Sequence, residues 1–146
     1  MSKNEIESKL GPIQESLTDV VWTTDRRVYL LCEGESSFAV NKFLYEELGL
    51  RFAIATAMDC ADHFEVLYHF SDDAVGCVVT TKAFIRDYAH PAVESIGQFL
   101  PGAEWIEREM HDEFGIEFVN HPDMRRLVLA DDWPEGEYPL RKKART

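Results

Sequence analysis

The stretch "RFAIATAMDCADHFEVLYHFSDDAVGCVVTTKAFI", residues Arg51 to Ile85, determines the fold class of this chain. It contains three runs rich in β-branched and aromatic residues, at 51–60, 63–71 and 75–85, and these residue types are favoured in strands. The segments between the runs, "ADH" and "DDA", are short and polar, as hairpin turns are. We therefore predict three consecutive antiparallel strands.

The middle run predicts which side of the sheet is buried. Successive side chains of a strand point to opposite faces, so alternate positions share a face. One face of "HFEVLYHF" collects Phe64, Val66 and Tyr68, and the other collects Glu65, Leu67 and His69. The first set is apolar and aromatic. We expect it to face the core.

The segment before this stretch predicts a helix and a hairpin. Four apolar residues recur at helical spacing near the N-terminus: Ile6, Leu10, Ile13 and Leu17. Gly11-Pro12 is expected to break or restart that helix. The run "DVVWTTDRRVYLLCE", residues 19–33, then reads as two β-rich segments around the polar turn "TTDRR".

A second helix is predicted in "SFAVNKFLYEELGL", with Ser36 or Ser37 as its cap and Gly49 at its end. The element order is then α-β-β-α-β-β-β. This order predicts an α+β fold: a two-layer α-β(2)-α-β(3) domain with a mixed sheet, whose helices cover one face.

After Tyr88 the pattern changes. Residues 90–115 contain two short helical patterns separated by Pro101-Gly102, and the second runs from 103 to 114 and ends at Gly115. Beyond Phe118 there is no periodicity. We therefore expect a globular domain over residues 1–118, including the short second helix, and an extended tail over residues 119–146. The tail carries more apolar residues than a solvated segment needs: Met124, Leu127, Val128, Leu129, Trp133, Tyr138 and Leu140.

Composition excludes several classes of partner. The chain has 146 residues, 45% of them hydrophobic, which suits one domain, and its net charge of −12 would be repelled by nucleic acid or an anionic lipid surface. The charge is uneven: residues 1–118 hold 9 basic and 22 acidic groups, residues 119–146 hold 6 and 5, and the tail ends in the basic run "RKKAR". From charge alone, we expect a solubilising surface, a solvated C-terminus and no nucleic-acid partner.

Cysteine spacing and hydropathy indicate the compartment. Cys32, Cys60 and Cys77 are scattered and form no Cys-x-x-Cys pair, so local spacing predicts neither an iron–sulfur cluster nor a structural zinc site. Buried free thiols in a reducing compartment are expected instead, although Cys60 lies near His63. No secretory signal and no run of about 20 apolar residues is found. We expect a cytoplasmic chain that meets a membrane only indirectly, through other proteins.

The segment "EREMHDEFGIEFVNHPDMRRL", residues 107–127, raises the question of catalysis. Its histidines and carboxylates suggest a metal site or an acid/base pair, and the corresponding function is a small stand-alone hydrolase using Glu109, His111, Asp112 and His121. However, a metalloprotease helix needs a second histidine four residues after the first, and none follows His111. Nucleophile-elbow, P-loop and dinucleotide-binding motifs are also missing.

The other interpretation of this segment is structural. Glu107, Arg108, Glu109 and Asp112 either form a mutually satisfied charge network or cap backbone donors of the following segment, as buried charges must be paired. Arg125 and Arg126 are the expected partners of unmatched carboxylates. The spacing favours such a network over a reaction centre.

The same segment carries a family resemblance. The string "WIEREMHDEFGIEFVNHPDMRRLVLADDW…YPLRK" resembles the thirty-kilodalton subunit family of respiratory complex I, which also supplies subunits of energy-converting membrane-bound nickel–iron hydrogenases. Upstream, "MDCADHFEVLYHFSDD" is similar to the strand pair of that family. The resemblance covers residues 51–142, and the first fifty residues match only in element order. Glu113 stands where the family usually has an apolar residue.

The resemblance implies a non-catalytic, cofactor-free subunit of the hydrophilic arm of a membrane-associated oxidoreductase, with no activity of its own. Expected partners are the large subunit that holds a quinone pocket or nickel–iron site, a ferredoxin-like iron–sulfur subunit and a small iron–sulfur subunit. Iron–sulfur clusters, and nickel–iron, FMN or quinone, would be in those other subunits. The short length of the chain and the presence of His111 favour the hydrogenase branch of the family. The expected location is peripheral, on the cytoplasmic face of the membrane.

The resemblance also implies which residues dock or organise the tail. Matching positions are Glu107, Arg108, Glu109, Asp112, Gly115, His121, Pro122, Asp123, Arg125, Arg126, Pro139, Leu140, Arg141 and Lys142, to which the apolar content of the tail adds Trp133. Tail prolines would reduce the conformational entropy lost on docking. None of these residues is expected to be a catalyst or a metal ligand.

Overall fold

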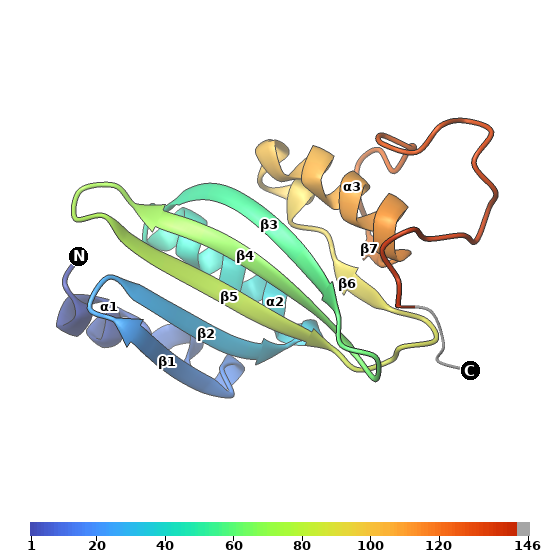
Figure 1. Ribbon diagram of the computed structural model, residues 1–146. Helices are drawn as coiled ribbons and strands as arrows, with labels where there is room; N and C mark the ends of the chain where they lie inside the picture. The colour runs from blue at the N-terminus through green and yellow to red at the C-terminus, as the bar shows by residue number, and fades with distance from the viewer. Residues whose placement is uncertain (143–146) are drawn as a thin grey trace.

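A five-stranded mixed sheet forms the body of the computed structural model, which describes residues 1–142 (Figure 1). Its strand order is β1-β2-β5-β4-β3. The strands are β1 (Asp19–Thr24), β2 (Arg27–Glu33), β3 (Arg51–Asp59), β4 (Phe64–Asp72) and β5 (Cys77–Ile85). Residues 143–146, which include the end of the expected tail and most of the basic run, lie outside the described residues.

The pairing of the strands confirms the predicted fold class. β3 pairs with β4, and β4 with β5, both antiparallel, as the stretch 51–85 predicts. β1 and β2 form the predicted hairpin. β2 runs parallel to β5, and this pair makes the sheet mixed. Parallel neighbours need a crossover connection, and the chain reaches the far edge of the sheet through helix α2 (Gly34–Lys42).

One face of the sheet is covered by helices. Figure 1 shows α2 crossing behind the strands. The 3-10 turn η1 (Gly11–Ser16), which follows α1 (Lys3–Lys9), packs against α2. The predicted alternation in β4 is confirmed, because Phe64, Val66 and Tyr68 are fully buried while their neighbours are partly exposed. Burial of such side chains is the main favourable term in folding.

The two predicted N-terminal helices are present, with one boundary corrected. α1 ends at Lys9 and η1 restarts at Gly11, as Gly11-Pro12 predicts. The second helix begins at Gly34 rather than after a Ser36 or Ser37 cap. A Cβ on Gly34 would lie 3.1 Å from the Phe84 carbonyl oxygen, so glycine lets the helix start directly against β5, and the Ser37 hydroxyl bonds back to the Gly34 carbonyl within the helix. After α2 the helix continues as one wider turn, η2 (Phe43–Glu47), and residue Gly49 follows with φ +64°.

A second, smaller unit follows the sheet. β6 (Ala92–Glu94) and β7 (Glu117–Val119) form a two-stranded parallel pair, with the turns η3 (Ile96–Gln98) and η4 (Pro101–Ala103) and helix α3 (Glu104–Phe114) between them. The prediction for α3 is confirmed to within one residue, and Gly115 ends it with φ +73°. The first of the two expected helical patterns is wrong: it becomes β6 and a single 3-10 turn, because η3 is bonded to a side chain of α3 instead of to a helical turn of its own.

Residues 120–142 contain neither helix nor strand; they follow β7 as a wide loop before returning beside the sheet (Figure 1). β7 spans the position at which the tail was expected to begin. Among the described residues, no helix has the length and apolar character needed to cross a membrane.

Candidate functional site

The Glu107 carboxylate lies fully buried and organises the loop before α3. It accepts hydrogen bonds from the Ser95 hydroxyl at 2.8 Å, from the Gly97 N–H at 2.9 Å and from the Ile96 N–H at 3.2 Å. Burial raises the pKa of Glu107 to about 7, although these three donors act in the opposite direction. The side chain therefore anchors η3 onto α3.

Arg108 and Asp112, one turn apart on α3, hold the start of the tail. The Arg108 guanidinium donates to the carbonyl oxygens of Arg125 and Arg126, at 2.8 and 2.9 Å. Asp112 Oδ2 accepts the backbone N–H groups of three successive tail residues, at 2.9, 2.9 and 3.3 Å: Leu127, Val128 and Leu129. The structure supports the second structural alternative for this pair: Arg108 and Asp112 bond backbone groups of the tail rather than each other.

The expected partnership of the tail arginines with the α3 carboxylates is wrong. The Arg125 side chain is 78% exposed and makes a two-pronged ion pair with Asp123, at 2.7 and 2.6 Å. The Arg126 guanidinium donates to the carbonyls of Ala130 and Asp131. α3 recognises the backbone of these arginines, and its buried carboxylates, Glu107 and Asp112, accept backbone N–H groups.

The proposed hydrolase cluster does not form. His111 Nδ1 contacts the Ile116 carbonyl at 2.8 Å, and His121 uses both ring nitrogens, with Nε2 on the Glu104 carbonyl and Nδ1 on the Asp123 N–H. Asp112 is occupied by the tail. Within residues 1–142, one group of three metal-ligating side chains clusters, and it does not include these residues. The hydrolase alternative has no support.

The far end of the tail returns to the sheet domain. The Arg141 guanidinium donates to the Phe114 carbonyl at 2.6 Å and lies over the rings of Phe64, Tyr88 and Tyr138. One residue later, the Lys142 N–H donates to Asp59. Cation–π contacts of this kind contribute about 0.5–2 kcal/mol. Arg141 therefore links α3, the tail and β4.

The remaining candidate positions lie along the loop between these two attachments. Pro122 and Pro139 are exposed, the Trp133 indole donates to the Glu137 carbonyl at 2.9 Å, and Leu140 is 51% exposed while its N–H bonds the Glu113 carbonyl. Burial raises the pKa of Glu113, and the nearby Glu109 and Asp112 add to this.

Sequence reasoning missed the residues that receive the tail. Asp59 accepts from the Lys142 N–H, the Ala61 N–H and the Tyr88 hydroxyl, and a Cβ on Gly115 would lie 2.4 Å from the Tyr138 ring. No local sequence pattern around Asp59 predicts this role. The available signal was an aspartate directly after the apolar residues Ala57 and Met58, where a buried charge requires a partner.

The cysteine prediction holds in part. Cys32 and Cys77 are buried free thiols, whereas Cys60 is half-buried, and no disulfide occurs among them. Burial raises the pKa of Cys60, and the Glu65 carboxylate raises it further, so this thiol is not an activated nucleophile.

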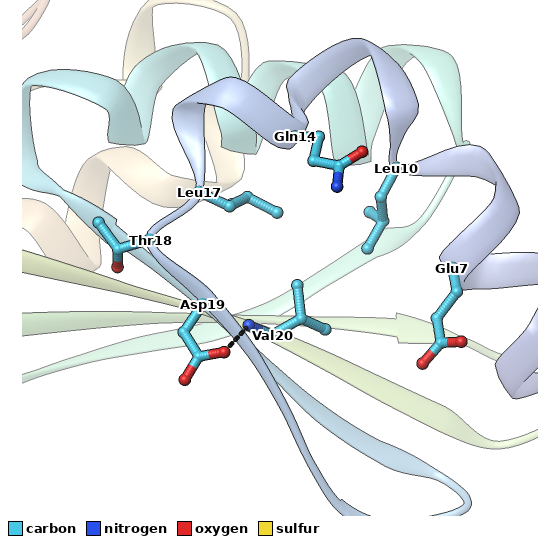
Figure 2. A pocket seen from close by; sticks show the side chains of 7 residues that line it. All are labelled: Glu7, Leu10, Gln14, Leu17, Thr18, Asp19 and Val20. Atoms are coloured by element: carbon cyan, nitrogen blue, oxygen red, sulfur yellow. Dashed lines mark hydrogen bonds between the residues drawn. The ribbon is translucent and has the colours of Figure 1, made fainter.

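A separate groove of about 440 Å³ lies between the N-terminal turns and β1. Figure 2 shows Leu10, Leu17 and Val20 pointing toward one another across it, with Glu7 and Asp19 at its edge. The Asp19 carboxylate is already bonded to the Val20 N–H. The residues that line the groove do not form a catalytic set of acid, base and nucleophile.

Comparison with known proteins identifies the family. Residues 30–146 match the family described as the respiratory-chain NADH dehydrogenase 30 kDa subunit. The chain belongs to this family. The string of motifs around α3 and the tail, together with the strand pair β3–β4, lies within the matched range, so the resemblance seen in the sequence is confirmed.

Members from both complex I and hydrogenase complexes are similar to this chain. An NADH-quinone oxidoreductase protein of Francisella tularensis subsp. holarctica is 34% identical over 131 residues, covering 88% of this chain and 57% of that protein. Formate hydrogenlyase subunit 5 of Escherichia coli K12 is 34% identical over 141 residues, covering 91% of this chain and 25% of that protein. The chain thus spans only part of the length of these relatives.

The fold is shared with a chain in the solved structure of the membrane-bound sulfane sulfur reductase, an archaeal respiratory membrane complex. The TM-score is 0.79, with 23% sequence identity, over 95% of this chain and 82% of that chain. At this level of identity the similarity shows the α+β architecture alone.

Proposed function

We propose that this family member is a non-catalytic subunit of the hydrophilic arm of a complex I-type or energy-converting hydrogenase-type oxidoreductase. In this proposal α3 and the tail dock on the large subunit that holds the quinone pocket or nickel–iron site. The docking supports assembly and thereby electron transfer, with iron–sulfur clusters and the nickel–iron, FMN or quinone groups in the large, ferredoxin-like and small iron–sulfur subunits. The chain reaches the cytoplasmic face of the membrane through that complex.

The observation that carries this proposal is the way the tail is held. Arg108 and Asp112 satisfy tail backbone groups, so the tail keeps a defined path without a helix or strand of its own. Several apolar side chains of the tail are exposed to solvent: Leu127 is 36% exposed, Val128 50% and Leu140 51%. Trp105 on α3 is 68% exposed. Pre-ordered apolar and aromatic groups of this kind are typical anchors of protein interfaces.

Arg125 is the polar group best placed to meet a partner. It projects from the tail, and within residues 1–142 its guanidinium pairs with Asp123 alone. Guanidinium groups are enriched at interfaces. We expect Arg125→Glu, and more strongly Arg125→Glu with Arg126→Glu, to leave the domain folded and to abolish assembly.

The test is a pull-down of the tagged chain from gently solubilised native membranes, with co-purifying subunits identified by mass spectrometry. The wild-type chain should bring down a large subunit with iron–sulfur and membrane subunits, and the variants should not. Arg51→Glu is the matched control, because Arg51 is also exposed and paired with a neighbouring carboxylate, Asp73, but lies at the start of β3. Normal assembly of the double variant, with circular dichroism unchanged, would remove the docking role of the arginines.

A further inference from the structure

Three side chains with different metal-ligating atoms meet at the β3–β4 turn. The Cys60 thiol, a ring nitrogen of His63 and a Glu65 oxygen all lie within 4.8 Å of one another, and all three residues are partly buried. The turn itself is tightly bonded: the Cys60 N–H donates to the His63 carbonyl at 2.9 Å, and Ala61 takes φ +73°. The three side chains are therefore presented by a short, well-defined hairpin rather than by a long loop.

The orientation of His63 is that of a histidine ligand. Its Nδ1 lies 2.5 Å from Asp62 Oδ1, and Nε2 faces Glu65 Oε1 at 3.3 Å. A metal-bound histidine almost always donates its other ring N–H to a carboxylate, which fixes the tautomer and aims the free lone pair. With the proton on Nδ1, His63 donates to Asp62 Oδ1, and the Nε2 lone pair is left facing the corner that Cys60 and Glu65 share.

The separation of His63 Nε2 and Glu65 Oε1 matches that of two ligands of one ion. A charge-assisted N–H···O bond is about 2.7–2.9 Å, shorter than the 3.3 Å between Nε2 and Oε1. Ligands at about 2.0–2.2 Å from a tetrahedral zinc ion lie about 3.3 Å apart. The Cys60 Sγ lies within 4.8 Å of both other ligand atoms and supplies the third position.

The surrounding charges leave this corner electronegative. Carboxylates of Asp59, Asp62 and Glu65 lie on the turn or at its ends. The Lys82 ammonium faces the other Glu65 oxygen at 3.8 Å, and the positive charge of Lys142 also acts on Cys60. Arg86, on the neighbouring segment, is occupied by Glu33 and stacks on Phe84, while Lys142 approaches Asp59 with its backbone N–H. Glu65 Oε1 therefore remains directed at His63.

We propose that Cys60, His63 and Glu65 bind one divalent transition-metal ion of the zinc class, with Asp62 as the positioning residue for His63. Sulfur and imidazole ligands favour zinc over magnesium or calcium, which take oxygen ligands. A single cysteine cannot hold an iron–sulfur cluster. The fourth position is open toward solvent, for water or one group from a neighbouring subunit. Because the same hairpin carries Asp59, the ion would stiffen the support of the returning tail.

This proposal goes beyond the docking role and differs from the expectation of a metal-free chain. The three residues follow the spacing Cys-x-x-His-x-Glu, which contains no cysteine pair. Metal binding by the purified chain does not depend on assembly, so its failure and a failure of the docking proposal are separate results.

The experiment is titration of the purified full chain with Zn²⁺ against a chromophoric chelator, and with Co²⁺ while the absorption spectrum is recorded. We expect one ion per chain and a thiolate-to-cobalt charge-transfer band. Cys60→Ser should abolish that band, and His63→Ala and Glu65→Gln should weaken binding at least tenfold. Cys77→Ser and His90→Ala are matched controls, because they remove a buried thiol and an exposed histidine elsewhere, and both should bind normally.

The positioning role of Asp62 has its own test. Asp62→Asn should weaken binding about ten- to a hundredfold while the cobalt band remains, and Asp62→Glu should recover part of the loss. Each variant is checked by circular dichroism. If Cys60→Ser does not fold, the wild-type cobalt spectrum decides, since Cys32 and Cys77 are 0% and 1% exposed. Absence of one-to-one binding, a bound ion without a thiolate band, or full affinity in folded His63→Ala would overturn the proposal.

Discussion

The backbone N–H of Lys142 donates a 2.8 Å hydrogen bond to Oδ2 of Asp59, across 83 positions of the chain. The same oxygen accepts the Tyr88 hydroxyl at 2.8 Å. Burial would raise the pKa of Asp59, but the donors Lys142, Ala61 and Tyr88 outweigh it and hold the pKa below its ordinary value. The end of the tail is thus attached to the end of β3 by a carboxylate that must be ionised.

Asp59→Asn is expected to release this attachment. The asparagine NH2 group is itself a donor, so it cannot accept at the oxygen position that it takes, and the three donors of Asp59 cannot all be satisfied. We expect a loss of about 1–3 kcal/mol of stability and faster exchange of the Lys142 amide proton. In the wild type this contribution is present above the ordinary pKa of 3.8 and is lost as the pH falls through the lower folded-state pKa. Hydrogen exchange followed by NMR provides the measurement. Asp73→Asn, which removes an exposed carboxylate, is the control, and equal exchange in both variants would contradict the attachment.

Gly115→Ala and Gly49→Ala form a second, matched pair. Both glycines have positive φ, +73° and +64°, but only at Gly115 would the new Cβ meet a side chain, at 2.4 Å from the Tyr138 ring. Gly49→Ala should cost about 1 kcal/mol for the left-handed backbone alone. Gly115→Ala should cost more and displace Tyr138, as measured by urea unfolding. In a Tyr138→Ala background the two glycine substitutions should cost the same, and a persistent difference would show that Tyr138 is not the cause.

Asp112→Asn should free the start of the tail. Its carboxylate receives three N–H groups, and hydrogen bonds to a charged group contribute about 1.5–3 kcal/mol each at most. We expect trypsin to cleave after Arg125 or Arg126 at least several-fold faster than in the wild type, with the sheet domain intact. Glu109→Gln serves as the control, because Glu109 lies on the same helix and, within the described residues, holds no tail backbone group. Equal cleavage of the two variants would argue against the role of Asp112.

Glu107 should make stability depend on pH. Its folded-state pKa is about 7, above the ordinary 4.5, so the folded protein holds a proton that the unfolded chain releases in this window. The contribution of Glu107 to the free energy of unfolding is fully present below pH 4.5. It falls by about 3 kcal/mol as the pH rises to 7, at 1.36 kcal/mol per pKa unit.

Urea unfolding at intervals between pH 4.5 and 8 measures this dependence. Glu107→Gln should be less stable at low pH by about 1–3 kcal/mol, because its amide faces a backbone donor, and it should lose the slope attributed to Glu107. Glu109→Gln, on the same helix, should keep the slope, because Glu109 is not among the groups that shift the pKa of Glu107. A difference between wild type and Glu107→Gln that does not vary with pH would contradict the titration.

Local patterns predicted much of the architecture. The alternation at Phe64, Val66 and Tyr68 was sufficient to place the core face of β4, because side-chain direction in a strand repeats every two residues. The end of α3 at Gly115 was also predictable, because a left-handed cap has a strong preference for glycine. The spacing of Arg108 and Asp112 correctly placed both on one side of α3.

Other features could not be predicted in this way. The first helical pattern after Tyr88 was overridden when Glu107 took the N–H groups of Ile96 and Gly97. Arg125 and Arg126 were given carboxylate partners because of their charge, but α3 binds their carbonyls, and a carbonyl is present at every residue whatever its side chain.

By itself, the amino-acid sequence determined the α+β class, the order of the main helices and strands, and the family, since these depend on periodicity, turn residues and an ordered set of motifs within short windows. Only the tertiary structure decided that Asp59 holds Lys142, that Tyr138 covers Gly115, and that Cys60, His63 and Glu65 share a corner. The physical reason is that such contacts join backbone groups and distant side chains. Their distances are set by the packing of the sheet, α3 and the tail as a whole.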